Sequence, residues 1–137
     1  MEKVFVDTNI ILDWLGQRLP YYLPAKELFK KADGKEILIL VSTMSFISIE
    51  YILRKQIGKT KTKQALFAMR TIITVCTSGE KEIDQSLASS FKDFEDAFQY
   101  YNALKNSAKV IISRNPKDFK NAKIPIMTAK EYLELKN

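Results

Sequence analysis

The sequence predicts a single α/β domain over residues 1–137, with a parallel sheet of four or five strands between two layers of helices (α/β/α). Three observations lead to this fold class. The chain of 137 residues has the length of one domain. Short apolar runs alternate with longer amphipathic stretches, and no linker or internal repeat interrupts them. Continuously apolar strands joined by helices are typical of parallel sheets that are covered on both faces.

The expected strands are the short apolar runs, of which the last is the weakest. They are Val4–Val6, Ile37–Val41, Ile72–Cys76, Val110–Ile112 and Ile124–Met127.

Helix signals fill the gap between the first two runs. A short helix is expected over about Asn9–Leu15, where apolar residues are frequent. A loop follows, and Pro24 suits the start of a second helix over Ala25–Ala32. Asp33-Gly34 ends this helix.

The later helices also have recognisable ends. Ser42 or Thr43 can cap a helix that continues to about Gln56 and stops at Gly58. Further helices are expected from Thr60 through Met69, over Glu82–Ser89, over Phe91–Asn106, and over Ala129–Leu135 with Thr128 as its cap.

Composition excludes several kinds of site. Histidine is absent and cysteine occurs once, at Cys76. These counts exclude histidine-based catalysis, histidine-liganded metals, internal disulfides and cysteine-only zinc sites. Any acid–base or metal chemistry must therefore come from aspartate and glutamate.

The net charge of +6 is compatible with nucleic-acid binding, and equally with a merely soluble surface. No stretch is apolar enough to span a bilayer and the first residues do not form a signal peptide, so we expect a cytoplasmic protein without a membrane partner. Two basic groups offer an RNA track: Lys55, Lys59, Lys61, Lys63 and Arg70, and then Arg114, Lys117, Lys120 and Lys123.

Acidic side chains follow the expected strands or begin the helices beside them. Ligands bind at the carboxyl ends of parallel strands, and Asp7 follows the first strand directly. Its alternative role is the N-cap of the next helix. Asp93 and Asp96 lie three residues apart, on a stripe beside the buried face of their helix, whereas Glu95 points more nearly to solvent.

Two further acids each have two interpretations. Asp118 follows the fourth strand and is either a turn residue or, with Asn115, an oxygen ligand. Glu50 interrupts a largely apolar helix and either lies on the surface or faces the same crevice. Carboxylates that converge repel one another, and a hard divalent cation resolves the repulsion. Mg²⁺ or Mn²⁺ bound there can polarise a phosphodiester without histidine.

Three segments together resemble the PIN domain family. They are Val6–Asp13, Asp93–Tyr100 and Ile111–Phe119, and they occur in the order and with the separations of that family. The resemblance covers essentially the whole chain. It implies a compact α/β/α fold with a metal-dependent ribonuclease site. Small bacterial members are similar to VapC-type toxins, which pair with an antitoxin protein and form homodimers.

The resemblance also implies roles for single residues. Asp7 and Asp96 match the acids that hold the metal, and Asp93 and Asp118 are expected to assist. Ser113 matches a hydroxyl residue that orients a carboxylate or the substrate. We assign substrate positioning to Asn9, Ser113, Arg114 and Asn115.

One position departs from the family. The helix acid after the second strand usually lies about six residues after the serine that ends the strand, which is Ser48 here. Glu50 is two residues further and faces nearly the opposite way if the helix is regular. Either the helix is shifted and Glu50 is a catalytic acid, or Asp93 compensates. A catalytically degenerate module that binds RNA or a protein without cleaving is the alternative function.

Two other classes share parts of this pattern. A phospho-signalling receiver domain needs an aspartate after its third strand, but Thr77 and Ser78 stand there. A nucleotide-binding fold needs a glycine-rich loop, and the chain has no such loop.

Overall fold

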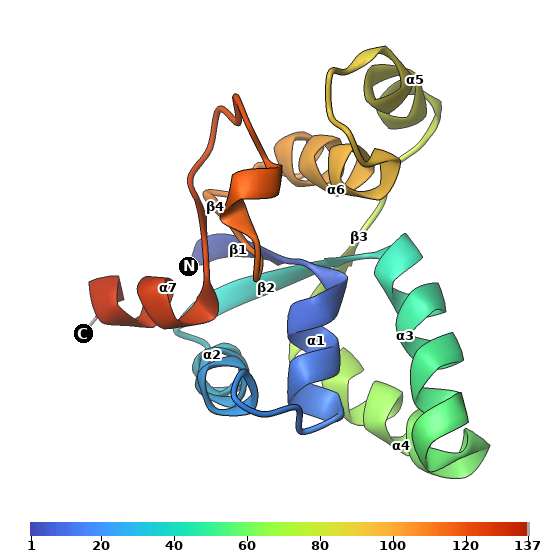
Figure 1. Ribbon diagram of the computed structural model, residues 1–137. Helices are drawn as coiled ribbons and strands as arrows, with labels where there is room; N and C mark the ends of the chain where they lie inside the picture. The colour runs from blue at the N-terminus through green and yellow to red at the C-terminus, as the bar shows by residue number, and fades with distance from the viewer. Residues whose placement is uncertain (137) are drawn as a thin grey trace.

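The computed structural model describes residues 1–136, which form a five-stranded parallel sheet between helices (Figure 1). The strand order is β3-β2-β1-β4-β5, and each neighbouring pair is parallel. The strands are β1 (Glu2–Val6), β2 (Ile37–Ser42), β3 (Ile73–Cys76), β4 (Val110–Ile112) and β5 (Ile126–Met127). The predicted fold class is confirmed.

Helices cover both faces of the sheet. One face is covered by α1, α2, α3, α4 and α7, and the other by α6, on which α5 packs (Figure 1). None of the helices in residues 1–136 is both long and apolar enough to cross a bilayer. Their bounds are α1 (Thr8–Leu15), α2 (Tyr22–Asp33), α3 (Thr43–Ile57), α4 (Lys59–Arg70), α5 (Glu80–Ala88), α6 (Phe94–Lys105) and α7 (Ala129–Lys136), with a 3-10 helix η1 at Pro116–Asp118.

The central strand β1 contributes to two cores. Val4 and Val6 belong to the larger core, together with residues of α1, α2, α3 and α7. Phe5 belongs to the smaller core, together with Tyr100 and Ala103 of α6. Because successive side chains of a strand point to opposite faces, the part of a strand that is covered on both sides must be apolar throughout. This explains why the buried part of β1, Val4–Val6, appears in the sequence as an uninterrupted apolar run.

The ends of α3 follow from two local features. The Ser42 hydroxyl oxygen accepts a hydrogen bond from the Ser45 backbone N–H at 3.1 Å, so Ser42, and not Thr43, is the N-cap. Gly58 has a φ of +86°, which a residue with a side chain rarely adopts, and it separates α3 from α4.

The start of α6 differs from the prediction, which placed it at Phe91. Asp93 is extended, and its Oδ1 accepts a hydrogen bond from the Asp96 backbone N–H at 3.0 Å, so the helix begins at Phe94. The ring of Phe91 instead lies near those of Tyr100 and Phe119, with centroid distances of 5.4 and 6.2 Å. The segment before α6, which contains Phe91, therefore packs against the side of this helix.

Two other predicted boundaries also change. Helix α2 begins at Tyr22, before Pro24, so this proline lies within the first turn, where its missing N–H costs nothing. The fifth strand is limited to Ile126–Met127, and Pro125 before it has no N–H to donate, although its carbonyl accepts a hydrogen bond from the Ile111 N–H at 3.0 Å.

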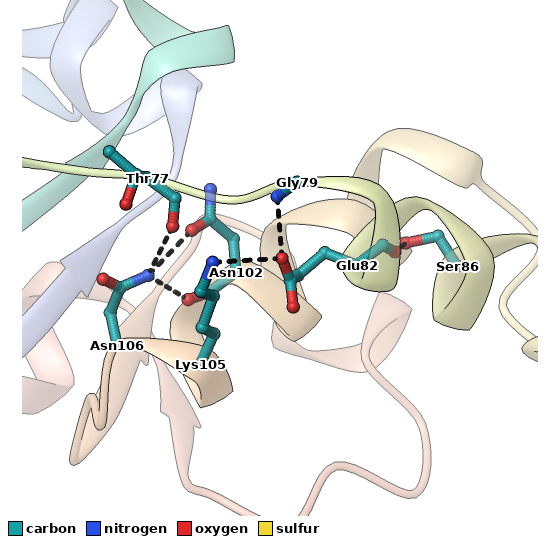
Figure 2. Close-up of polar contacts among 7 residues, drawn as sticks. All are labelled: Thr77, Gly79, Glu82, Ser86, Asn102, Lys105 and Asn106. Carbon is teal, nitrogen blue, oxygen red and sulfur yellow. Dashed lines mark hydrogen bonds and ion pairs between the residues drawn. The ribbon is translucent and has the colours of Figure 1, made fainter.

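Polar contacts fix the far end of α6 (Figure 2). The Asn106 side-chain amide donates to the Thr77 carbonyl at 3.2 Å and to the Asn102 carbonyl at 2.8 Å. The buried Glu82 carboxylate of α5 accepts from the Gly79 N–H at 2.8 Å and lies 3.5 Å from Lys105 Nζ. The loop after β3 and both helices are thereby held together.

Two leucines of α2 test the packing of the larger core. Leu28 is fully buried, whereas Leu23 is 62% exposed. We expect Leu28→Ala to lower the free energy of unfolding by about 2–5 kcal/mol, because it removes apolar contacts and leaves a cavity. Leu23→Ala should change it by less than about 0.5 kcal/mol. Urea unfolding measures both, and equal effects would contradict the described packing of α2.

Candidate functional site

The strand order reverses at β1, and this places a crevice at one edge of the sheet. The chain passes from β1 to β2 and β3 on one side, and returns to β4 and β5 on the other. Ligand sites in such sheets lie outside the carboxyl ends of the strands at the reversal. Asp7 and Ser113 are the first residues beyond β1 and β4. The Asp7 N–H donates to the carbonyl of Ile112 at 3.0 Å, so the two strand ends are joined there.

Asp7 is 8% exposed, and both of its carboxylate oxygens accept hydrogen bonds. Its Oδ1 accepts from the Thr8 N–H at 2.8 Å and, more weakly, from Gln99 Nε2 at 3.5 Å. Its Oδ2 accepts from the Ser113 hydroxyl at 3.4 Å. The pKa of Asp7 is raised above its ordinary value, mainly by burial and to a smaller extent by the nearby charge of Asp93. The hydrogen bonds to its carboxylate offset part of this rise. Asp7 is therefore both the cap of α1 and a carboxylate at the sheet edge.

The first turn of α6 brings further carboxylates to the same edge. Burial, followed by the charges of Asp93, Asp7, Asp118 and Glu95 in that order, raises the pKa of Asp96 to about 7. Burial also raises the pKa of Glu95, with additional contributions from the charges of Asp7 and Asp93. The acids that repel Asp96 directly follow β1, lie at the start of α6, or belong to η1. The fold therefore brings together groups that are distant in sequence.

A hollow of about 520 Å³ lies beside these acids. It is open to solvent and combines both signs of charge with the ring of Phe91. The lining residues are Ser90, Phe91, Lys92, Asp93, Asp96, Lys117, Asp118 and Lys120. Asp118 therefore lies with Asp93 and Asp96, and three lysines stand next to them.

Three predicted site residues have other surroundings. Glu50 forms an ion pair with Arg54, at 3.0 Å between Oε2 and Nε, and both side chains are nearly half exposed. It is not among the charges that shift the pKa of Asp7 or Asp96. The side chains of Asn9 and Asn115 are exposed, and the Asn115 backbone N–H donates to the Ser113 hydroxyl at 3.2 Å.

Arg114 is held by a buried partner instead of facing the crevice as a free cation. Its guanidinium forms a two-pronged ion pair with the fully buried Asp13 of α1, with 2.9 Å from Nε to Oδ2. Its other contact is the ring of Tyr21, 4.1 Å from the guanidinium carbon. An arginine in this arrangement fastens α1 and the loop after it to the end of β4.

Sequence reasoning missed the polar residues behind Asp7. Gln99 of α6 is fully buried, and its Nε2 donates to the Ser45 hydroxyl at 2.9 Å and to the Thr8 hydroxyl at 3.3 Å. The hydroxyls of Thr8 and Ser45 lie 2.7 Å apart. A signal for Gln99 was present, because it continues the stripe of Asp93 and Asp96 by three residues.

The donor set suits a hard cation held by few protein ligands. Carboxylate oxygens are the preferred ligands of Mg²⁺ and Mn²⁺. Within residues 1–136, no three His, Cys, Asp or Glu side chains are close enough to hold an ion by themselves. Mg²⁺ is usually bound through one or two carboxylates, with water and ligand oxygens completing its shell. The residues present fit that mode and do not form an all-protein cage.

Comparison with known proteins identifies relatives of the whole chain. A family model described as PIN domain matches residues 3–117. The chain is 29% identical to Ribonuclease VapC1 of Aquifex aeolicus (strain VF5) over 138 aligned positions, which cover 97% of this chain and 94% of the relative.

Solved structures share the fold at low sequence identity. DNA-bound VapBC from Salmonella typhimurium matches with a TM-score of 0.71 and 14% identity, over 94% of this chain and 99% of that chain. VapBC-1 from nontypeable Haemophilus influenzae matches with a TM-score of 0.70 and 16% identity, over 93% and 98%. Mycobacterium tuberculosis VapC20, described as a sarcin-ricin loop cleaving toxin, matches with 0.63 and 15% identity, over 79% and 86%.

The pKa of Asp96 predicts how stability depends on pH in the absence of metal. The folded protein holds the Asp96 proton up to about pH 7, whereas the unfolded chain releases it near the ordinary value of 3.8. The free energy of unfolding therefore falls as pH rises between these values. Asp96→Asn has no carboxyl group to ionise at this position. At pH 8 in EDTA the free energy of unfolding of this variant should therefore exceed that of the parent protein by roughly 1 kcal/mol, after allowance for solvent screening.

Thermal unfolding at pH 4.5 and pH 8 measures this difference. The two proteins should have similar stability at the lower pH and diverge at the higher pH. A parent protein as stable as Asp96→Asn at pH 8 would contradict the crowding of charge around Asp96.

The ion pair of Arg114 predicts a large stability loss on substitution. Arg114→Met leaves the carboxylate of Asp13 buried without its partner, which should cost on the order of 3 kcal/mol. The matched control is Arg54→Met, which breaks the exposed pair with Glu50 and should cost less than about 1 kcal/mol. Urea unfolding distinguishes the two variants, and similar losses would argue against Arg114 as a structural fastener.

Proposed function

The chain belongs to the PIN domain family, and on this premise we propose that it is a metal-dependent endoribonuclease, the toxin of a cytoplasmic toxin–antitoxin pair. The observation that carries the proposal is the convergence of Asp7, Asp93, Asp96 and Asp118 at the carboxyl edge of the sheet. The similarity to Ribonuclease VapC1 supports RNA as the substrate. The similarity to VapBC complexes supports an antitoxin protein as the partner.

In this proposal Asp7 and Asp96 hold Mg²⁺ or Mn²⁺. Asp7 lies at the reversal of the strand order and Asp96 in the first turn of α6, and the charge of Asp7 is one of those that raise the pKa of Asp96. When bound, the cation would neutralise this charge, polarise the phosphodiester and make water a better nucleophile. Asp93 and Asp118 assist from the wall of the hollow, where a carboxylate can accept the proton of the attacking water.

Other residues orient the reacting groups. The Ser113 hydroxyl donates to Asp7 Oδ2 and accepts from the Asn115 N–H, so it links the loop after β4 to the carboxylate. Lys92, Lys117 and Lys120 line the hollow beside the acids and can contact RNA phosphates on either side of the scissile bond. A second copy of the chain, as in a homodimer, would extend this basic track.

A catalytically degenerate module that binds RNA or a protein is the second candidate, favoured by the position of Glu50. Its ion pair with Arg54 means that α3 supplies no carboxylate from this residue to the site. Ser48, where the family usually has its helix acid, is only partly buried. If the site is merely weakened, Ser48→Glu should raise the rate of RNA cleavage.

Cleavage of mixed cellular RNA by the purified protein tests the two functions. The reaction is run with Mn²⁺, with Mg²⁺ and with EDTA. Asp7→Asn is the matched control, because asparagine caps a helix as well as aspartate does, while its neutral amide lacks the negative charge that attracts the cation. The proposed nuclease cleaves with metal, and Asp7→Asn lowers the rate by at least about 100-fold.

Other outcomes have distinct meanings. Cleavage that persists in Asp7→Asn would indicate a contaminating nuclease and remove support for the site. RNA binding without cleavage by the parent and by Ser48→Glu would favour the degenerate module.

The lysines of the hollow should determine the salt dependence of RNA binding. In an Asp7→Asn background, which prevents cleavage, Lys117→Gln and Lys120→Gln should each weaken binding of labelled single-stranded RNA. The slope of log affinity against log salt concentration should become shallower by about 0.7 for each lost phosphate contact.

Lys30→Gln is the control, because Lys30 is also exposed and lies on α2, on the opposite face of the sheet from α6 and outside both predicted basic groups (Figure 1). An unchanged slope in Lys117→Gln and Lys120→Gln, or an equal change in Lys30→Gln, would rule out the hollow as the RNA-binding surface.

A further inference from the structure

Gln99 joins three elements of the fold in its interior. It lies on α6, three residues after Asp96, and is fully buried. Its Nε2 donates to Ser45 at the start of α3 and to Thr8 at the start of α1. The Ser42 hydroxyl also donates to Ser45, at 3.1 Å. We call the four residues Thr8, Ser42, Ser45 and Gln99 the polar junction.

The polar junction is poorly explained as a source of stability. In the part of the chain that the structure describes, Gln99 Oε1 is buried and has no hydrogen-bond partner. An unpaired buried acceptor destabilises the folded state, and an apolar side chain of similar size would avoid this cost. We therefore look for the role of Gln99 in the hydrogen bonds that its Nε2 group donates.

The hydrogen bonds of Gln99 Nε2 connect the two parts of the fold that carry the carboxylates of Asp7 and Asp96. Asp7 lies next to Thr8, and its Oδ1 is 3.5 Å from Gln99 Nε2. Asp96 lies one turn before Gln99 on the same helix. Apolar packing is not directional, whereas a hydrogen bond depends on the distance and angle between its donor and acceptor. The hydrogen bonds of Gln99 therefore add a directional constraint on the position of α6 relative to Thr8 and Ser45.

We propose that Gln99 is a positioning residue, which through the polar junction holds the first turn of α6 at the distance from Asp7 that a shared divalent cation requires. This inference rests on the proposed function, because it concerns the same cation. Gln99 does not touch the cation or the RNA. It acts through Thr8 and Ser45 on one side and through the backbone of α6 on the other.

Mn²⁺ binding to the RNA-free protein, measured from the loss of the free Mn²⁺ signal in electron paramagnetic resonance, tests the proposal. Gln99→Met keeps the volume but removes the donor, and Ser45→Ala removes its nearest acceptor. Each should weaken Mn²⁺ binding by about 10-fold, the lower end of the effect of losing a residue that orients a metal ligand. If Gln99→Met does not fold, Ser45→Ala alone decides.

The matched control is Asn102→Leu. Asn102 is also fully buried on α6, one turn further from Asp96, and its Nδ2 is likewise unpartnered within residues 1–136. Its side-chain oxygen belongs to the contacts at the far end of the helix (Figure 2). We expect Asn102→Leu to bind Mn²⁺ as the parent does, whatever its melting temperature.

Asp96→Asn separates failure of this inference from failure of the proposed function. If Asp96→Asn loses Mn²⁺ binding while Gln99→Met and Ser45→Ala keep the parent affinity, positioning by Gln99 is wrong and the metal site stands. If Asn102→Leu weakens binding as much as Gln99→Met does, the effect is general to α6 and the inference is also wrong. If Asp96→Asn binds Mn²⁺ as the parent does, the metal site itself is wrong, and the positioning role falls with it.

Discussion

The burial of β1 is the constraint on which the rest of the structure depends. This strand is paired on both edges and covered on both faces, and Val4, Phe5 and Val6 are fully buried. A charged side chain at any of these three positions would lose its hydration without compensation. Beyond them, towards the carboxyl end of the strand, the first position that can carry a carboxylate is Asp7, where β1 ends and helix α1 begins. The location of the candidate site follows from the same hydrophobic requirement that organises the fold.

The fold holds several like charges close together, and local hydrogen bonds offset part of the repulsion. Asp7 and Asp93 each accept a backbone N–H at the start of a helix, where the helix dipole also favours negative charge. Asp96 has no such partner for its side chain among the hydrogen bonds of residues 1–136, and burial with the nearby charges raises its pKa to about 7. Burial raises the pKa of Asp7 as well, so the backbone hydrogen bonds offset only part of the cost of gathering these carboxylates.

The elements that depend on local sequence were predictable, and those that depend on distant partners were not. The apolar runs at Val4–Val6 and Val110–Ile112 identified central strands, and the position of Asp7 after the first run identified the sheet edge. Phe91 continued the apolar spacing of α6, but Asp93 caps the helix and Phe91 packs outside it. Glu50 illustrates helical phase, because Ser45 and Ile49 face inward and Glu50 turns toward Arg54.

Long-range polar pairing left no such signal. From the sequence, Arg114 was assigned to positioning the substrate. In the structure it pairs with Asp13, which is 101 residues away in the sequence and had no feature that marked it as buried. Gln99 did lie on the stripe of Asp93 and Asp96, but its contact with Ser45 had no signal in the sequence. That contact depends on how α6 crosses the start of α3, which the assembled sheet determines.

The pairing of Arg114 with Asp13 leaves lysines as the cations of the hollow beside the acids. An arginine binds phosphate through a planar, two-pronged arrangement that selects one orientation, whereas a lysine ammonium is a hydrated point charge on a flexible stem. Any polyanion entering this hollow would be attracted without being aligned. Discrimination between one strand and another would have to come from shape, from the ring of Phe91, or from surfaces beyond the hollow.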